Sequence, residues 1–304
     1  MSEPEPPPDV TAPGRLRMLL TGAGGQVGSA VRQRTPAEAT VVALDSGMLD
    51  ITDENAVRAA VAAAGAHVIL NAAGYTAVDQ AESEPERAFA VNRGGAANLA
   101  AAARANGVRL IHLSTDFVFD GAQGAPYGPE APCRPINTYG ASKRAGEEAV
   151  QAVAGDSAVI VRTSWVYAAQ GRNFVLTMLN LLRERPEVRV VTDQIGSPTW
   201  AVSLADALWG LARRPDLSGI HHWTDAGVAS WYDFAVAIQE EGLALGLLSR
   251  CVPIHAISSG DLPRPARRPS FSVLDTSQTT RALDLAPAHW RENLRRMLRE
   301  VHAA

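Results

Sequence analysis

The chain has 304 residues, a hydrophobic fraction of 46% and a formal net charge of −4. This length and apolar content suit one large α/β domain, or a nucleotide-binding domain with a smaller companion. The charge gives no indication of a nucleic-acid partner, and no apolar run is long enough to cross a membrane. The start lacks the features of a signal peptide, and Cys133 and Cys251 are too few for a disulfide framework, so we expect a reduced, cytoplasmic setting.

Residues 1–14 are rich in proline and glutamate, and we expect them to form a disordered leader. A short buried strand is predicted over residues 15–20, followed by a turn with three evenly spaced glycines, Gly22, Gly25 and Gly28. Such glycines let the backbone turn sharply and approach a pyrophosphate, and they direct the amides of the next helix toward its charge. The turn therefore predicts dinucleotide binding, although its spacing differs from the G-x-G-x-x-G of many dehydrogenases.

The second strand is predicted over residues 40–45 and ends in an acid, Asp45. An acid about 20 residues after the glycines is suited to bind the adenosine ribose. Its charge would repel a 2′-phosphate, and no arginine follows it directly. Asp50 is a second candidate on the adenine side, with a solvated turn residue as the alternative. Thr52 is the expected N-cap of a helix that ends near Ala64.

A third buried strand, over residues 67–73, leads to a loop that begins with Gly74, Tyr75 and Thr76. This loop would lie at the carboxyl edge of the sheet, where ligands bind in parallel sheets. A long alanine-rich helix is then expected from Pro85 to about Asn106, where Gly107 ends it.

The fourth strand, predicted over residues 109–115, brings Ser114, Thr115 and Asp116 to the same edge. A hydroxyl at this place could hydrogen-bond both a substrate carbonyl and a nearby phenol. His112 lies inside the apolar part of the strand, and we interpret it as a buried structural residue rather than a catalytic one.

Tyr139 and Lys143 are four residues apart, so a helix places them on one face, one turn apart. An ammonium beside a phenol favours the phenolate and lowers the pKa of the tyrosine. A tyrosine of this kind can donate a proton to a developing alkoxide. Lys143 is the only lysine in the chain, which indicates a task that arginine cannot perform. The alternative is a surface helix that carries this pair by chance.

A strand over residues 158–163 is followed by Trp165, which either covers the pocket or packs in the core. The β–α alternation up to this point predicts a Rossmann-type α/β fold, a doubly wound parallel sheet with right-handed crossovers. We expect residues 15–168 to form the dinucleotide-binding domain, with later segments interleaved. Residues 169–304 would form mainly a smaller α/β substrate-binding portion.

The later segments alternate less regularly. Helices are expected over residues 172–185, 200–214, 231–241 (capped by Ser230) and 287–302, with strands over 188–192 and 219–223 and a polar turn over 193–199. His221 and His222 would point to opposite faces of a strand and so make a poor metal pair. Arg267 and Arg268 lie in a loop stiffened by prolines and could hold a diphosphate, with a solvated loop as the alternative.

The glycine turn, the Ser-Thr-Asp stretch and the Tyr139-x-x-x-Lys143 pair resemble the extended short-chain dehydrogenase/reductase superfamily. Within it, the chain is similar to the dTDP-4-dehydrorhamnose reductases. The matching stretches are residues 25–28, 71–79, 113–121, 162–167, 193–199, 230–234 and 265–269. Because they include the substrate half, the match is more specific than a shared fold.

The resemblance implies that hydride passes from NADH or NADPH to C4 of dTDP-4-dehydro-β-L-rhamnose, which gives dTDP-L-rhamnose. Tyr139 would donate the proton, Lys143 would bind the nicotinamide ribose, and Thr115 would hold the substrate carbonyl. Asp116 and Trp165 would contact the sugar nucleotide. The implied cofactor-binding residues are Gly22, Gly25, Gln26, Val27, Gly28, Asp45, Asp50, Ile51, Gly74, Tyr75, Thr76 and Lys143.

Two departures from the family pattern matter. Phe117 stands where relatives usually carry a tyrosine, which removes a hydroxyl near the pocket. Some relatives form a metal-bridged homodimer through a glutamate in the first helix after the glycines, whereas residues 28–31 contain no acid here. The resemblance thus allows magnesium and a homodimer, but this stretch gives them no support, and we predict no metal ligand.

Two other functions stay open. The regulatory β subunit of methionine adenosyltransferase is similar to this family and binds nucleotide without catalysis, but it would not need an acid at Tyr139. Another nucleotide-sugar reductase, epimerase or dehydratase is the second alternative. Dehydratases usually carry a glutamate after the aspartate, where this chain has Phe117.

Overall fold

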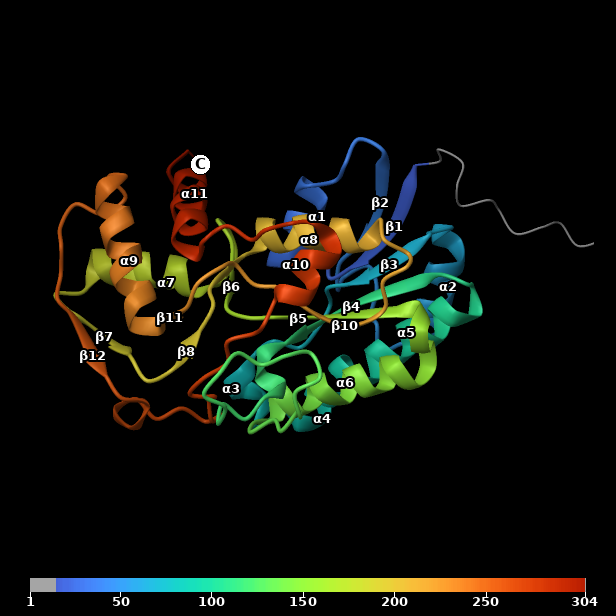
Figure 1. The fold of residues 1–304 in the computed structure, drawn as a ribbon, viewed down its shortest axis with the longest axis horizontal. Coiled ribbons are helices and arrows are strands. Elements are labelled where there is room, and N and C mark those ends of the chain that lie inside the picture. The colour runs from blue at the N-terminus through green and yellow to red at the C-terminus, as the bar shows by residue number, and fades with distance from the viewer. Residues whose placement is uncertain (1–14, 304) are drawn as a thin grey trace, which may run out of the picture.

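A sheet of six parallel strands forms the centre of the computed structural model, which describes residues 15–303 (Figure 1). The strands lie in the order β10 (Gly219–His222), β5 (Ala158–Thr163), β4 (Arg109–Thr115), β3 (Val68–Asn71), β1 (Leu16–Thr21) and β2 (Ala39–Leu44). Because β1 has β2 on one side and β3 on the other, the winding reverses there and a crevice opens beyond the carboxyl ends. The predicted doubly wound parallel sheet is confirmed. The predicted leader over residues 1–14 lies outside the described residues.

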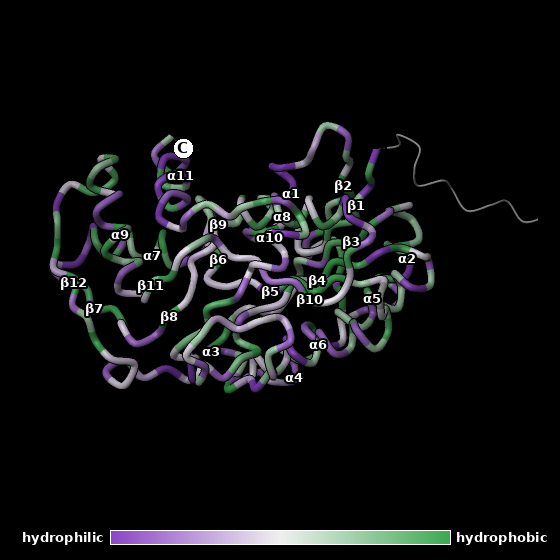
Figure 2. Tube along the Cα trace, in the orientation of Figure 1, coloured by the Kyte–Doolittle hydropathy of each residue, from purple (hydrophilic) through white to green (hydrophobic). Residues whose placement is uncertain are grey.

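Helices cover both faces of this sheet (Figure 1). One face is covered by α1 (Gln26–Gln33) and α8 (Ala201–Ala212), and the other by α2 (Glu54–Ala64), α5 (Ala96–Ala105) and α6 (Thr138–Ala154). Strands buried on both faces are almost continuously apolar, as parallel sheets require, and Figure 2 shows hydrophobic residues gathered where these strands run. Since α8 and β10 follow residue 168, the sheet is completed by segments from the second half of the chain.

A second hydrophobic cluster lies beside the sheet, at the left of Figure 1. It is built on α7 (Phe174–Glu184), α9 (Trp231–Ala244) and α11 (Trp290–Ala303), with the parallel pair β7 (Val188–Val191) and β12 (Ile254–Ile257). Two further short pairs are β6 (Val166–Tyr167) with β9 (Thr199–Trp200), and β8 (Ile195–Gly196) with β11 (Ala229–Ser230). The remaining helices are α3 (Val78–Ala81), α4 (Pro85–Phe89) and α10 (Ser277–Leu283), with 3₁₀ turns η2 (Asp116–Val118), η3 (Gly155–Ser157) and η4 (Ser259–Asp261).

Two local predictions are wrong. Asp53, not Thr52, caps α2, because its carboxylate accepts from the amides of Asn55 and Ala56. The helix predicted over residues 85–106 is broken into α4, a π-helical segment η1 (Ala90–Gly95) and α5. Such π segments often lie at functional sites.

The predicted cap of α9 is confirmed. The Ser230 hydroxyl accepts from the Asp233 amide, and the Asp233 carboxylate accepts in return from the Ser230 amide.

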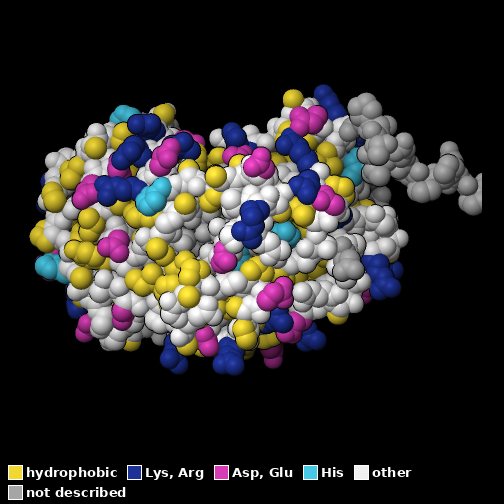
Figure 3. Space-filling model, in the orientation of Figure 1, with side chains coloured by type: hydrophobic (Ala, Val, Ile, Leu, Met, Phe, Trp, Pro, Cys, Tyr) yellow, Lys and Arg dark blue, Asp and Glu magenta, His cyan; other side chains and the backbone are white. Residues whose placement is uncertain are grey.

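Acidic and basic side chains are interspersed over the face shown in Figure 3. Within residues 15–303, none of the helices combines the length and the apolar character that a membrane span requires.

Candidate active site

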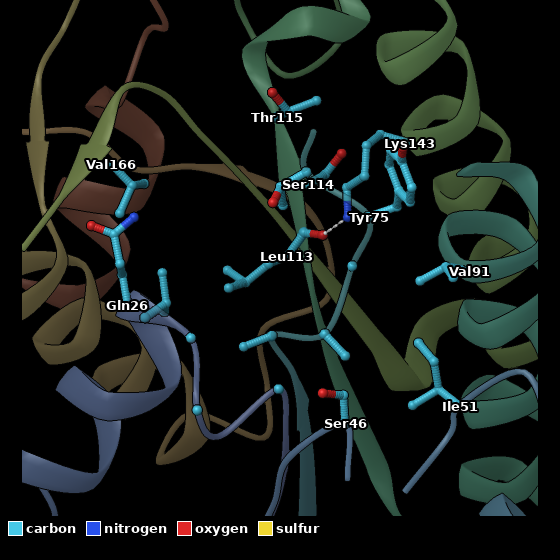
Figure 4. A pocket seen from close by; sticks show the side chains of 18 of the residues that line it. Gln26, Ser46, Ile51, Tyr75, Val91, Leu113, Ser114, Thr115, Lys143 and Val166 are labelled. Carbon is cyan, nitrogen blue, oxygen red and sulfur yellow. Dashed lines mark hydrogen bonds between the residues drawn. The ribbon is translucent and has the colours of Figure 1, made fainter. Parts of the chain in front are cut away.

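A cavity of about 1220 Å³ lies across the carboxyl ends of the sheet strands. Its walls come from the glycine turn, the loops after β2 and β3, the end of β4, helix α6 and the segment after β5; Figure 4 shows Gln26 and Val166 across the cavity from Lys143. The predicted site residues that line it are Gly22, Gly25, Gln26, Val27, Asp45, Asp50, Ile51, Gly74, Tyr75, Thr76, Thr115, Asp116, Tyr139, Lys143 and Trp165. The cavity thus brings together most of the predicted site, while Gly28, Arg267 and Arg268 lie outside it.

The glycine turn leaves no room for side chains. Gly22 has a φ of +70°, and a Cβ on it would lie 2.5 Å from the carbonyl carbon of Ala72. A Cβ on Gly28 would lie 2.3 Å from the Gly22 carbonyl oxygen, so α1 packs directly on the turn. Helix α1 begins after Gly25 without a side-chain cap, which leaves its first amides available to an anion. This arrangement fits the pyrophosphate of a dinucleotide.

Two acids, Asp45 and Asp50, line the cavity near the end of β2. Asp45 follows β2 directly, and its Oδ1 accepts from the amides of Gly47 at 2.9 Å and Met48 at 3.1 Å. Asp50 accepts from both the amide and the hydroxyl of Thr52, and these bonds lower the pKa of Asp50. Asp50 therefore shapes its own turn as well as lining the cavity.

Asn92 holds the loop after β3 against helix α6. Its buried side chain accepts from the Tyr75 amide at 2.8 Å and donates to the Tyr75 carbonyl at 3.1 Å and to the Ser142 hydroxyl at 2.9 Å. Sequence reasoning missed this residue. The available signal was the stretch Asn92-Arg93-Gly94-Gly95, which interrupts an alanine-rich helix at the π-helical segment η1.

Tyr139 and Lys143 both lie in the first turns of α6, which begins after the N-cap Asn137. Lys143 is only 5% exposed, and its Nζ donates to the Leu113 carbonyl at 2.6 Å (Figure 4). Burial lowers the pKa of Lys143 to about 8, while the charge of Glu147, one turn further along α6, opposes the shift. The predicted shared face is confirmed, because both residues line the cavity.

The predicted effect of Lys143 on the tyrosine is wrong. Burial raises the pKa of Tyr139 to about 12, the nearby charge of Asp116 adds to the shift, and the Thr115 hydroxyl opposes it. Burial therefore dominates the pKa of Tyr139, while the Lys143 Nζ donates to the Leu113 carbonyl. The raised pKa favours the neutral phenol, which is the form that can donate a proton.

Thr115 and Asp116 lie where β4 passes into η2. The Thr115 hydroxyl donates to Asp116 Oδ1 at 3.0 Å and accepts from the Phe117 amide at 3.2 Å. Burial raises the pKa of Asp116 to about 7. The Phe117 ring packs edge-on against the Tyr139 ring, with 5.8 Å between centroids. Phe117, which replaces the usual tyrosine, therefore supports the ring of the proposed proton donor.

A buried ion pair joins helix α6 to β5, and sequence reasoning missed it as well. Arg162 of β5 donates from Nε and Nη2 to the two carboxylate oxygens of Glu147, each at 2.8 Å. Burial disfavours the charge of Glu147, but the bonds from Arg162 outweigh it and lower the pKa of Glu147. The pair fixes α6, and with it Tyr139 and Lys143, to the sheet.

The three histidines of the sheet have structural surroundings. His112 Nδ1 lies 2.9 Å from the Asn71 amide nitrogen, and burial holds the pKa of His112 well below its usual value. His222 lies beside Arg162, whereas His221 contacts Thr279 on the other face. Among residues 15–303, no group of three His, Cys, Asp or Glu side chains is arranged to hold a metal ion.

Trp165 combines the two roles considered for it. It lines the cavity, and its ring also stacks on Trp231 with 3.6 Å between centroids. Its φ of +48° is unusual for a bulky residue and indicates backbone strain at the site. A Cβ on Gly196 would lie 2.6 Å from the indole, so the stack depends on glycine there.

The two arginines of the proline-stiffened loop differ. Arg268 forms an ion pair with Asp79 at 2.9 Å, and its guanidinium lies over the Phe117 ring. Arg267 is exposed and borders a separate hollow of about 430 Å³, while its carbonyl accepts from Asn137 at 2.8 Å. The loop therefore packs against the start of α6.

The comparisons with known proteins agree on one family. The family model described as "RmlD substrate binding domain" matches residues 16–303. The chain is 45% identical to the dTDP-4-dehydrorhamnose reductase of Streptomyces griseus, over 92% of each protein. It is 41% identical to the spore coat polysaccharide biosynthesis protein SpsK of Bacillus subtilis, over 95% of this chain and 99% of that protein.

A solved structure supports the same assignment. The dTDP-4-dehydrorhamnose reductase of Bacillus anthracis, in complex with NADP, superposes with a TM-score of 0.88 at 36% identity, covering 94% of this chain and 99% of that one. Both the match of the family model and these identities extend over nearly the whole chain. The chain therefore belongs to the family described as the RmlD substrate binding domain.

Proposed function

We propose that this chain reduces the C4 keto group of dTDP-4-dehydro-β-L-rhamnose to dTDP-L-rhamnose with NADPH or NADH, the last step of dTDP-rhamnose synthesis. The observation that carries the proposal is the meeting of Tyr139, Lys143 and Thr115 in one cavity with the glycine turn. The names and the NADP complex of the relatives point to the same reaction.

The roles of the residues follow from their positions. A bound reduced nicotinamide supplies the hydride. Thr115 would orient the substrate carbonyl, and Tyr139, as a neutral phenol, would donate the proton to the developing alkoxide. Lys143 would bind the nicotinamide ribose.

The cofactor would lie along the glycine turn, with its pyrophosphate at the start of α1 and its adenosine toward Asp45. Gly22, Gly25, Gln26, Val27 and Gly28 would form the turn, with Asp45, Asp50, Ile51, Gly74, Tyr75 and Thr76 along the rest of the dinucleotide. We propose no magnesium ion for this reaction.

The dTDP-sugar would be held mainly by residues 169–304, next to a dinucleotide-binding domain over residues 15–168 with later segments interleaved. Asp116 and Trp165 would contact the sugar nucleotide from the cavity. Arg267 and Arg268 would bind its diphosphate, although Arg268 already pairs with Asp79. A homodimer and a cytoplasmic location remain predictions.

The test is turnover of the purified protein with dTDP-4-dehydro-β-L-rhamnose, followed by the absorbance of NADPH or NADH. We expect oxidation of the cofactor with a dTDP-L-rhamnose product, and none with Tyr139→Phe. A protein that binds the nucleotides but oxidises neither cofactor would instead be a binding subunit.

A further inference from the structure

Asp116 is a buried carboxylic acid with one unsatisfied oxygen. The residue is 2% exposed and lines the cavity. Its Oδ1 accepts from the Thr115 hydroxyl at 3.0 Å, whereas its Oδ2 is buried and finds no hydrogen-bond partner among the residues that the structure describes. A buried carboxylate oxygen without a partner is costly, whereas a protonated carboxyl carries no charge to solvate.

The neighbourhood of Asp116 offers no compensating cation. Tyr139 faces it from α6, Thr115 and Phe117 adjoin it in the chain, and the Ser272 hydroxyl faces it from the C-terminal segment. Two cations of this region have other partners: Lys143 donates to the Leu113 carbonyl, and Arg268, which lies over the Phe117 ring, pairs with Asp79.

Glu147 shows what a matched cation would do. This carboxylate is equally buried, but Arg162 donates two hydrogen bonds to it and lowers its pKa. Asp116 has no such partner, and burial raises its pKa to about 7. The protein thus keeps one buried acid ionised for structure and leaves the other free to exchange a proton near neutral pH.

We propose that Asp116 stores the proton that restores Tyr139 after each reduction, with the Thr115 hydroxyl as the link between them. This inference rests on the proposed reductase function. Reduction of the ketone uses one hydride and one proton, and the proton given up by Tyr139 leaves a phenolate. When Asp116 is protonated, its carboxyl donates to Thr115 Oγ1 across the same 3.0 Å, which frees the Thr115 hydroxyl to donate to Tyr139. The Thr115 hydroxyl proton then passes to the phenolate oxygen, while the Asp116 carboxyl proton passes to Thr115 Oγ1. Tyr139 and Thr115 are restored, and the negative charge moves to Asp116.

The transfer runs in the favourable direction, because the Tyr139 phenol has a pKa of about 12 and the Asp116 carboxyl one of about 7. A cavity filled by substrate and cofactor excludes water. A proton held inside the site would therefore be available without a path to solvent. Asp116 would recover its proton from water once the product leaves.

The first test is the pH dependence of kcat for Asp116→Asn, which keeps the size of the side chain but cannot release a proton in this way. We expect kcat of the wild type to fall above about pH 7, where Asp116 loses its proton. In Asp116→Asn, kcat should be lower by about 10²-fold, and the fall of kcat above pH 7 should be absent. Asp120→Asn is the matched control, because Asp120 caps a turn outside the cavity and its removal should leave the profile unchanged.

The second test needs no turnover. Carbon-13 NMR of aspartate-labelled protein should show one carboxyl that titrates near pH 7 and is absent in Asp116→Asn. Ser272→Ala removes a hydroxyl that favours the carboxylate, so the pKa of Asp116 should rise. The pH at which kcat begins to fall should rise with it. A carboxyl signal of Asp116 that titrates below pH 5 overturns the proposal.

The outcomes separate the possible roles. If Asp116→Asn raises KM for the sugar nucleotide but its kcat still falls above pH 7 as in the wild type, Asp116 only binds substrate. The proposal that it stores a proton is then rejected. If the wild type reduces no dTDP-sugar at all, the proposed function is rejected. The role of Asp116 is then rejected as well, because it depends on that reaction.

Discussion

The buried pair of Glu147 and Arg162 makes a strong prediction about how the catalytic helix is held. Neither side chain reaches solvent, and the two hydrogen bonds at 2.8 Å are the direct link between α6 and β5 at this point. Glu147→Gln leaves the guanidinium of Arg162 buried beside a neutral amide. Removing one partner of such a pair costs about 3–5 kcal/mol in the free energy of unfolding. For a chain of 304 residues, that corresponds to a decrease in Tm of roughly 5–8 °C.

The assay is thermal unfolding followed by circular dichroism, with two comparison variants. Arg144→Gln removes a partly exposed partner of the same carboxylate and should cost about 1 kcal/mol or less. Glu147→Leu combined with Arg162→Met replaces both charges by apolar groups and should recover most of the stability. A Tm of Glu147→Gln within about 2 °C of the wild type would refute the reasoning, because the pair would then contribute nothing that Gln cannot supply.

The same pair predicts how stability depends on pH. The pKa of Glu147 is lower in the folded protein than the ordinary value of 4.5. Its contribution is therefore complete above pH 4.5 and is lost as the pH falls through the lower folded pKa. The difference in the free energy of unfolding between the wild type and Glu147→Gln should shrink in that acidic range and stay constant above it.

Three further predictions concern the reaction. Tyr139→Phe should lose about 10²- to 10⁴-fold in kcat with little change in cofactor affinity, because the ring still packs and only the proton is missing; turnover within a few-fold of wild type would remove Tyr139 from the mechanism. With Asp45 after β2 and no arginine next to it in the chain, kcat/KM for NADH should be at least comparable to that for NADPH, and a hundredfold preference for NADPH would contradict this. Replacing Arg267 and Arg268 together by alanine should weaken dTDP-rhamnose binding by about 1.5–3 kcal/mol per lost charged hydrogen bond. Calorimetry should show unchanged NADH affinity, and Arg267→Ala alone separates the exposed arginine from the one tied to Asp79.

Local spacing was enough to predict the parts of the site that lie close together in the chain. Tyr139 and Lys143 share a helix face because a turn of α-helix brings residues four apart together. The glycine turn was predictable because only glycine permits such a close approach of backbone, as at Gly22 and Gly28. The order of strands and helices followed from their alternation, since parallel strands need crossovers.

The tertiary structure decided everything that depends on distant partners. The Tyr75 loop is held by Asn92 from 17 residues further along the chain, and Arg268 is held by Asp79 from the other half of the protein. The pKa of Tyr139 was also decided by the tertiary structure. Helix spacing suggested that Lys143 lowers the pKa of Tyr139, but burial raises that pKa instead. Sequence spacing gives neighbours along an element, whereas a pKa depends on desolvation and on charges from every element packed around the group, which only the folded chain defines.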